Sequence, residues 1–571
     1  MRAATDSKPL GIKYGVEDRP PLWQAALLIL QHVLTVSGAL VIPALIAREG
    51  GSTAGEASHL IAVSLLAMGI GTLFQANRRL GSGYLCTAVC GAEFVPASIL
   101  AIKTGGLPLL SGMLIITALF QILLVPVVTR LRSLFPVEVT GVVVFMTGLS
   151  LVRYSMGGFL GVVNGQVFAN SGAMGVSVLT LALLVTACVW GRGVIRQYAL
   201  LIGIAGGVLL SHLLAPGTNP SPGIVGGLPV FAIPFPGPRG LAWSPALLGL
   251  FLIAGFCSLL GTLGNVTACQ KINTVDWRRP DMPRLGRGVL AEALGNLVGG
   301  FFGSAGLGSS ASSAGLSLAT GVTSRCIGTG VGLGYLCLAF FPGLISRFAL
   351  LPGPVLDACL VFSISFIMLA GFQILMSRMI DARRTFVIGF SIVAGLFVEM
   401  NPAIRGSASA AWQPFLGSAL SVSAIVALVL NLLFRLGVKK TAELRLDEEP
   451  DHTPAIHRFL EEQGAAWGVR REVIDRAGFA TLQYVEALSG PRTRPDAIGV
   501  KARFDEFHLD IEIAHPGRRV DLPMVMPSPD EMLADDAGVA KMAGYLVRRH
   551  ADRVSTEQQG DTVRVKLAFD H

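Results

Sequence analysis

Glu93 is the most informative titratable residue of this 571-residue chain. It lies between Gly91 and Pro96 in an apolar region, where a carboxylate is energetically costly. The carboxyl could couple proton or cation movement to solute binding, or contact a solute directly. Alternatively, it could stay protonated and hydrogen bond to nearby backbone. Glu292, in LAEALGNL, is the second candidate for coupling, with a structural pairing to a loop arginine as its alternative.

The stretch Gly303–Thr323 supplies further polar groups, including six serines, between two strongly apolar segments. Non-helical backbone at membrane depth is tolerated only where protein buries it or a water-filled cavity solvates it. Transporters bind solutes at such interrupted segments, with the N–H groups of a half-helix directed at the ligand. A second interrupted segment, Gly81–Gly106, contains Glu93. The pair favours a solute site over the alternative that small residues only let helices pack closely.

The candidate site combines residues of both interrupted segments with hydroxyls of an apolar segment between them. His32 is a third candidate for coupling, although a buried histidine is more often a hydrogen-bonded packing residue. Asp357 and Glu138 are expected to stabilise the starts of their helices through the helix dipole. The residues expected to contact solute are Cys90, Gly91, Glu93, Phe94, Ser258, Thr262, Ser310, Ser312, Ser313 and Gly315.

The elements that position these residues are membrane spans. The chain is 52% hydrophobic and only 14% charged, against about 25% charged residues in soluble domains. The fold class is therefore an all-α polytopic membrane protein, and fourteen segments divide into a 7+7 inverted repeat typical of a secondary transporter. We expect spans at about residues 23–47, 56–75, 81–102, 106–129, 137–158, 172–190, 196–214, 243–269, 286–302, 304–323, 326–346, 353–377, 383–400 and 412–436.

The distribution of Lys and Arg over the connections supports the count of fourteen spans. With residues 1–22 in the cytoplasm, the inner connections hold eighteen Lys and Arg residues and the outer ones six. Both termini are then cytoplasmic, in an inner membrane, and the net charge of +8 indicates topology and not nucleic-acid binding. None of the eight cysteines has metal-ligand spacing, and we find no motif of an ATP-driven pump. We therefore expect no metal, no cofactor and no enzymatic activity.

Composition changes after the last span. Residues 438–452 are expected to form a charged linker, and residues 453–571 a soluble α+β domain. Helices are predicted at Thr453–Trp467 and Arg470–Leu488, a hairpin at Val500–His515, a helix at Pro529–Arg553 capped by Ser528, and a last strand at Thr562–Phe569.

Two motifs carry a family resemblance. LQHVLTVSGALVIP, with Gln31 and His32, and FGSAGLGSSASSAGLSLATGVTSRCIG resemble conserved regions of the nucleobase–ascorbate transporters. This resemblance covers residues 23–437 and implies a core (about 23–129 and 243–346) that moves against a gate (about 137–214 and 353–437). It also implies a short strand in each interrupted segment, a homodimer, and transport of uracil, xanthine, uric acid or ascorbate with a proton or sodium.

Three serines depart from that family's pattern. Its signature begins with Gln or Glu followed by Asn, where this chain has Ser312 and Ser313, and Ser258 occupies the place of a base-binding glutamate. These departures put the specificity for a base in question, but we expect a nucleobase or purine-type solute such as xanthine or uracil, with an anion or organic-acid transporter, or a channel-like conductor, as the alternatives. The C-terminal domain faintly resembles histidine-kinase ATPase folds but lacks their magnesium-binding Asn and Asp-x-Gly turn. A regulatory or docking role is left, and with it the alternative of a membrane sensor.

Overall fold

A computed structural model gives the fold, which falls into two compact units: Met1–Leu375 with Ile388–Leu428, and Met376–Val387 with Val429–His571. The residues that the structure describes are 9, 11–36, 40–130, 137–162, 170–192, 194–215, 231, 240–275, 280–341, 351–376, 382–401, 403, 416, 418–434, 440–446, 452–488, 498–505, 508–517, 519–528, 536–560 and 562–570.

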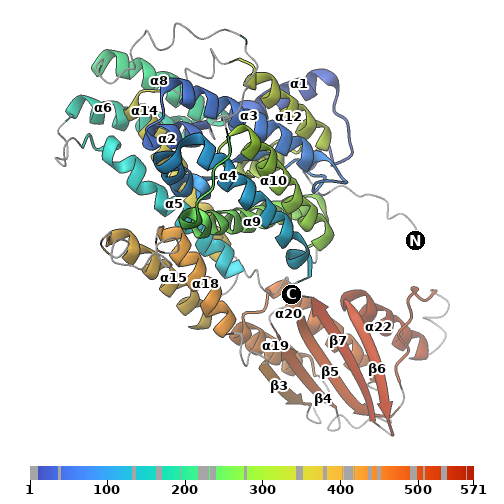
Figure 1. Ribbon diagram of the computed structural model, residues 1–571. Helices are drawn as coiled ribbons and strands as arrows, with labels where there is room; N and C mark the ends of the chain where they lie inside the picture. The colour runs from blue at the N-terminus through green and yellow to red at the C-terminus, as the bar shows by residue number, and fades with distance from the viewer. Residues whose placement is uncertain are drawn as a thin grey trace. The chain divides into compact units, whose positions relative to one another are not determined.

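The first unit is helical (Figure 1). Two helices, α15 and α18, are divided between the units. The helices are α1 (Leu22–Val36), α2 (Val41–Gly50), α3 (Ala54–Ala76), α4 (Val95–Arg130), α5 (Val137–Phe159), α6 (Ser171–Val189), α7 (Val194–Gln197), α8 (Ala199–Leu214), α9 (Pro245–Asn273), α10 (Met282–Phe302), α11 (Ala311–Thr320), α12 (Arg325–Ala339), α14 (Gly353–Leu375), α15 (Ala382–Met400) and α18 (Ala419–Leu433).

Within the described residues, six helices are long and apolar enough to cross a membrane, and four apolar helices are shorter. The chain is therefore an integral membrane protein, and the count of fourteen spans stays a prediction. The expected first span, 23–47, is divided between α1 and α2. Gly106, at φ 68°, interrupts α4, as expected of a break between the third and fourth spans. The left-handed φ explains why glycine stands there.

The two interrupted segments meet in a two-stranded antiparallel sheet. Strand β1 (Ala88–Cys90) pairs with β2 (Leu307–Ser309), so that Val89 lies opposite Gly308. Two further backbone bonds extend the pairing: the Gly91 N–H donates to the Gly306 carbonyl at 2.8 Å, and the Ser310 N–H donates to the Thr87 carbonyl at 2.9 Å. Each strand leads directly into a helix, β1 through the short 3-10 helix η2 (Ala92–Phe94) into α4, and β2 into α11.

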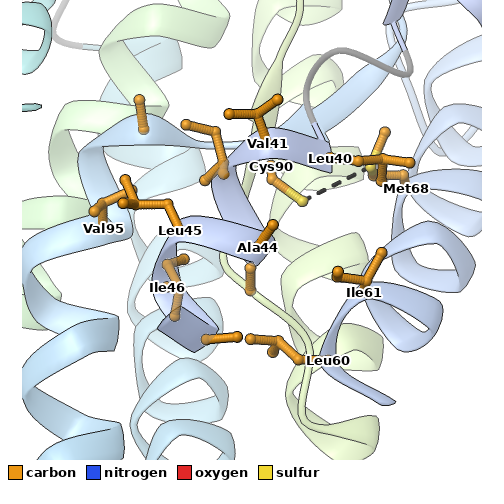
Figure 2. Close-up of a cluster of buried hydrophobic side chains, with 14 of the residues drawn as sticks. Leu40, Val41, Ala44, Leu45, Ile46, Leu60, Ile61, Met68, Cys90 and Val95 are labelled. Atoms are coloured by element: carbon orange, nitrogen blue, oxygen red, sulfur yellow. Dashed lines mark hydrogen bonds between the residues drawn. The ribbon is translucent and has the colours of Figure 1, made fainter. Parts of the chain in front are cut away.

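A buried hydrophobic cluster supports the β1 side of this crossing (Figure 2). Residues of α2 and α3, including Leu45, Leu60 and Met68, belong to it, and it holds the side chain of Cys90 at the end of β1. The thiol of Cys90 lies 3.7 Å from the Met68 sulfur. Fully buried aliphatic side chains of this kind each contribute about 1.5–3 kcal/mol to stability, so the cluster anchors the strand.

The C-terminal part of the second unit is an α+β fold with a five-stranded antiparallel sheet in the order β3-β4-β5-β7-β6 (Figure 1). One face of the sheet is buried, and α19 and α20 contact its strands. The elements are β3 (Lys440–Arg445), α19 (Thr453–Trp467), α20 (Arg471–Leu488), β4 (Gly499–Phe504), β5 (His508–Pro516), α22 (Asp536–His550), β6 (Arg553–Gln559) and β7 (Thr562–Asp570).

Two details of this domain correct the sequence-based expectations. Strand β3 lies inside the expected linker 438–452; it is an edge strand with few apolar residues, so its sequence has the composition of a linker. The expected start of the third helix, directly after Ser528, lies outside the described residues, which show α22 from Asp536. Strand β6 was not expected, and its first residue, Arg553, is the last residue of the predicted helix, whose observed end is His550.

Candidate functional site

The crossing of β1 and β2 places the starts of two helices beside helix α9. Ser310 caps α11, since its hydroxyl accepts a hydrogen bond from the Ser313 N–H at 3.3 Å. Gly91 precedes the short helix η2, whose Phe94 N–H donates back to the Gly91 carbonyl at 3.2 Å. Helix N-termini carry partial positive charge and free N–H groups, so the crossing favours an electronegative ligand.

Glu93 lies in η2 and is partly exposed, and its side chain lies against backbone at glycine positions. A β-carbon added at Gly91 would lie 2.5 Å from the Glu93 Oε1 atom. At Gly308 the same construction gives 2.8 Å to that oxygen and 3.2 Å to the Ser258 hydroxyl. The carboxyl of Glu93 and the hydroxyl of Ser258 therefore converge on β2, and only glycine leaves room for them.

Glu292, on α10, is buried and receives three hydrogen bonds. Gln121 of α4 donates to its Oε1 at 2.8 Å, and the Ser258 hydroxyl donates to the same oxygen at 2.6 Å. The hydroxyl of Thr262 donates to its other oxygen. Ser258 and Thr262 are both on α9, so one carboxyl ties three helices together. In the part of the chain that the structure describes, no arginine pairs with Glu292, although a pairing with a loop arginine was one of its expected roles.

Two buried amides complete the network, and the sequence reading did not single them out. The Asn296 Nδ2 donates to the Leu307 carbonyl at 3.0 Å and to the Gln121 Oε1 at 3.1 Å, while its Oδ1 accepts the Leu307 N–H at 2.6 Å. Gln121 also donates to the Gly255 carbonyl at 3.0 Å. Asn296 thus binds β2 as a neighbouring strand would. A signal was available, because Glu292 and Asn296 are four residues apart and share a helix face.

Helix α9 also has room beside it. A β-carbon at Gly261 or Gly264 would meet no atom within 4 Å, and the same holds for Gly315 on α11. Asn265 donates to the Ser309 carbonyl at 3.0 Å and to its hydroxyl at 2.9 Å, which joins α9 to the end of β2. Among the described residues, these three glycines next to the polar crossing therefore leave room for an added group, which is the open space that we refer to below.

The remaining expected site residues differ in their burial and in what their side chains contact. Phe94 is fully buried and its ring covers Gly306, while Cys90 packs in the hydrophobic cluster, so both side chains support the crossing. Ser312 is exposed and shares a 2.7 Å hydrogen bond with Ser310. The hydroxyl of Ser313 is buried without a hydrogen-bond partner among the described residues.

His32 stands apart from the two carboxyls. Its Nδ1 lies 2.9 Å from the Leu28 carbonyl, one turn earlier on α1. Its Nε2 is buried without a hydrogen-bond partner in the described part of the chain. The described residues show no hydrogen bond or ion pair between His32 and Glu93 or Glu292, so the network at β2 does not include it.

Asp357 corrects a sequence-based expectation. It was expected to act only through the dipole of its helix, but its buried carboxylate forms an ion pair with Arg48 at 2.8 Å. Arg48 belongs to α2 and also donates to the Tyr154 carbonyl of α5 at 3.2 Å. The pair joins helices that are 309 residues apart in sequence, which no local pattern indicates.

The comparisons with known proteins agree with this architecture. A model of the Permease family matches residues 23–404. The chain belongs to that family. Xanthine permease XanP of Escherichia coli strain K12 is 29% identical over 437 residues, 74% of this chain and 94% of that protein. Uric acid permease PucJ of Bacillus subtilis strain 168 is 29% identical over 445 residues, 76% of this chain and 97% of that protein.

Among solved structures, the murine anion transporter Slc26a9 in its inward-facing state matches with a TM-score of 0.52 at 12% identity. The match covers 77% of this chain and 72% of that one, and it shows a shared fold. The Permease family match ends at residue 404, so the sheet of the C-terminal domain lies outside it.

Proposed function

We propose that this permease is a secondary active transporter of a nucleobase, of the xanthine or uric acid type, driven by a proton or sodium. The observation that carries the proposal is the crossing of β1 and β2, where Glu93 and Ser258 converge on bare backbone next to open space. A planar base has edges of donors and acceptors, which backbone groups, hydroxyls and one carboxyl can pair. The names of the relatives support the solute class.

Transport would proceed by alternating access between two groups of helices. Helices α1–α4, α9, α10 and α12 contact one another, and α5, α6, α8 and α14 form a second set of mutual contacts. These sets support a core of about residues 23–129 and 243–346 and a gate of about 137–214 and 353–437. In this proposal, the contacts of α5 with α9 and of α14 with α2 lie at the boundary between the gate and the core, which move against each other.

The two acids take different roles in this proposal. Glu93 is partly exposed beside the open space, so it contacts the solute and carries the coupling proton. Glu292 is enclosed by three donors and holds α9, α10 and α4 around the strand, with coupling as its alternative role. Eighteen inner against six outer basic residues support cytoplasmic termini in an inner membrane. A homodimer through the gate helices completes the proposal.

A second candidate is an anion or organic-acid transporter. Ser258, Ser312 and Ser313 stand where the resembled transporters carry acid or amide groups, and two helix starts meet at the site. Hydroxyls and helix N-termini suit an anion, because an anion needs hydrogen-bond donors and not the matched donors and acceptors that the edge of a base requires.

Uptake into proteoliposomes tests both candidates. Labelled xanthine and uric acid should enter the parent vesicles saturably and accumulate with an imposed proton or sodium gradient. Glu93→Gln should still bind and exchange solute but fail to concentrate it, because the amide mimics a permanently protonated carboxyl. Glu56→Gln is the matched control: Glu56 is exposed in the capping box of α3, where Gln retains the acceptor.

Two results would contradict the proposal. Uptake of dicarboxylates without uptake of either purine would favour the second candidate, and accumulation by Glu93→Gln at the parent level would move coupling to Glu292. Deleting residues 440–571 separates a transporter from a sensor. The cut must precede β3, since that strand belongs to the C-terminal sheet. A transporter keeps measurable uptake after this deletion.

A further inference from the structure

The C-terminal domain exposes three consecutive apolar side chains on the bend after β5. Met524 is 77% exposed, Val525 78% and Met526 53%. Nearby, Phe479 of α20 is 39% exposed and its ring centroid lies 4.6 Å from that of His550, at the end of α22. Consecutive exposed apolar residues on a polar surface mark a contact with a protein or a membrane.

A basic pocket of about 500 Å³ adjoins this bend. Among the described residues, Arg519 and Arg548 line it together with the hydroxyl-bearing Thr556, and Asp521 supplies the one carboxylate of this lining. Arg548 donates to the Leu522 carbonyl at 3.1 Å, which fixes the guanidinium next to the start of the bend. Two guanidiniums and one hydroxyl are donors that suit a phosphate group.

One side of the pocket, at Arg548 and Leu522, lies at the end of the sheet where β3 begins, whereas β5 ends at Pro516, opposite Thr562, at the other end. Register places Lys440, the first residue of β3, opposite Phe504, and His508 opposite Asp570. Arg553 begins β6 opposite Ala568, at the same end. Arg548 lies one turn before this strand, so it and the adjoining Leu522 belong to this end.

The tether to the membrane is short. Helix α18 ends at Leu433, and β3 begins at Lys440. At about 3.3–3.6 Å per residue, the chain between these residues spans at most about 25 Å. The entry end of the domain is therefore confined to the neighbourhood of the bilayer.

We propose that Met524–Met526 inserts into the adjacent leaflet and that Arg519 and Arg548 hold the phosphate of an anionic phospholipid. The apolar side chains gain burial at the headgroup boundary. Each arginine near an anionic surface strengthens docking by about fivefold. The C-terminal domain is then a lipid-docking module whose position on the membrane depends on leaflet charge. This proposal does not depend on the identity of the transported solute.

Hydrogen exchange of the full-length protein tests the proposal in nanodiscs of phosphatidylcholine alone and of phosphatidylcholine with phosphatidylglycerol. Peptides that cover residues 519–528 should exchange more slowly in the anionic discs. The double variant Arg519→Gln/Arg548→Gln should lower the docking equilibrium by about 25-fold and remove most of that difference. Met524→Ser/Met526→Ser should remove protection in both discs.

Val539→Ser is the matched control, because Val539 is 63% exposed near the start of α22, away from the pocket. It should leave the lipid dependence unchanged, and unaltered exchange in β5 and β7 verifies that each variant is folded. Equal exchange of residues 519–528 in both discs and in detergent overturns the proposal. The proposal is also overturned if the protection of these residues from hydrogen exchange depends on protein concentration and not on lipid charge. That result would assign the bend to contacts between copies of the chain.

Discussion

Replacing Asn296 by leucine tests whether the amide network holds β2, the strand at the proposed solute site. The side chain of Asn296 is fully buried, and both of its amide hydrogens and its carbonyl oxygen are hydrogen bonded. Leucine has similar volume but no polar atoms. The variant therefore orphans the Leu307 N–H and the Gln121 Oε1, whereas the Leu307 carbonyl keeps only a share of the single Ser258 hydroxyl hydrogen, which lies between this carbonyl at 3.0 Å and Glu292 Oε1 at 2.6 Å.

Each buried polar group left without a partner costs about 1–3 kcal/mol, so two cost about 2–6 kcal/mol. If the strand relieves this cost by moving away from α10, the binding-competent state loses population by the same free energy. Every 1.4 kcal/mol is about tenfold in affinity, so even the lower limit predicts a loss of more than tenfold. A structural role without effect on the site would lower the unfolding temperature alone.

Two measurements on purified protein check this: the unfolding temperature in detergent and the concentration dependence of xanthine uptake in proteoliposomes. Thr117→Val is the matched control, because this buried hydroxyl donates only to the Met113 carbonyl of its own helix, at 2.8 Å. It should change neither quantity appreciably. An Asn296→Leu variant with the parent's unfolding temperature and uptake would refute the role assigned to the network.

Three further predictions follow from single contacts. Arg48→Ala leaves the buried Asp357 carboxylate unpaired and should lower the free energy of unfolding by about 3–5 kcal/mol. Adding Asp357→Ala should restore part of the unfolding temperature. If it restores none, the pair is not a stabilising contact. Burial lowers the pKa of His515, whose ring bonds to the Tyr484 hydroxyl at 3.0 Å, so the native domain binds fewer protons than the unfolded chain. Stability of the C-terminal domain should therefore fall as pH drops below about 6.5, and His515→Gln should flatten that profile in circular-dichroism melts. Gly315→Leu should insert and fold normally, because nothing lies within 4 Å of its β-carbon position, yet block uptake by filling the open space; parental uptake would place the solute elsewhere.

The sequence by itself determined the class of the protein and the position of the two interrupted segments at which we propose the solute site. Apolar runs of membrane length and serine- or glycine-rich interruptions are local signals, because the bilayer requires every exposed backbone group to be satisfied within the segment. They predicted an interruption at Glu93 and another at Gly303–Thr323, and the structure pairs these segments in one sheet. Amphipathic periodicity likewise predicted α19 with its observed bounds, Thr453–Trp467.

Only the tertiary structure decided which partners the polar residues have. Glu292 meets Gln121 across 171 residues, and Arg48 meets Asp357 across 309, because helix packing and not sequence spacing brings these atoms together. Strand β3 became recognisable only through its pairing with β4, since an edge strand is exposed and needs few apolar residues. Asn296 acquired its role in the same way. An amide inside an apolar helix becomes a strand-binding group only once another segment presents an unpaired N–H and carbonyl to it.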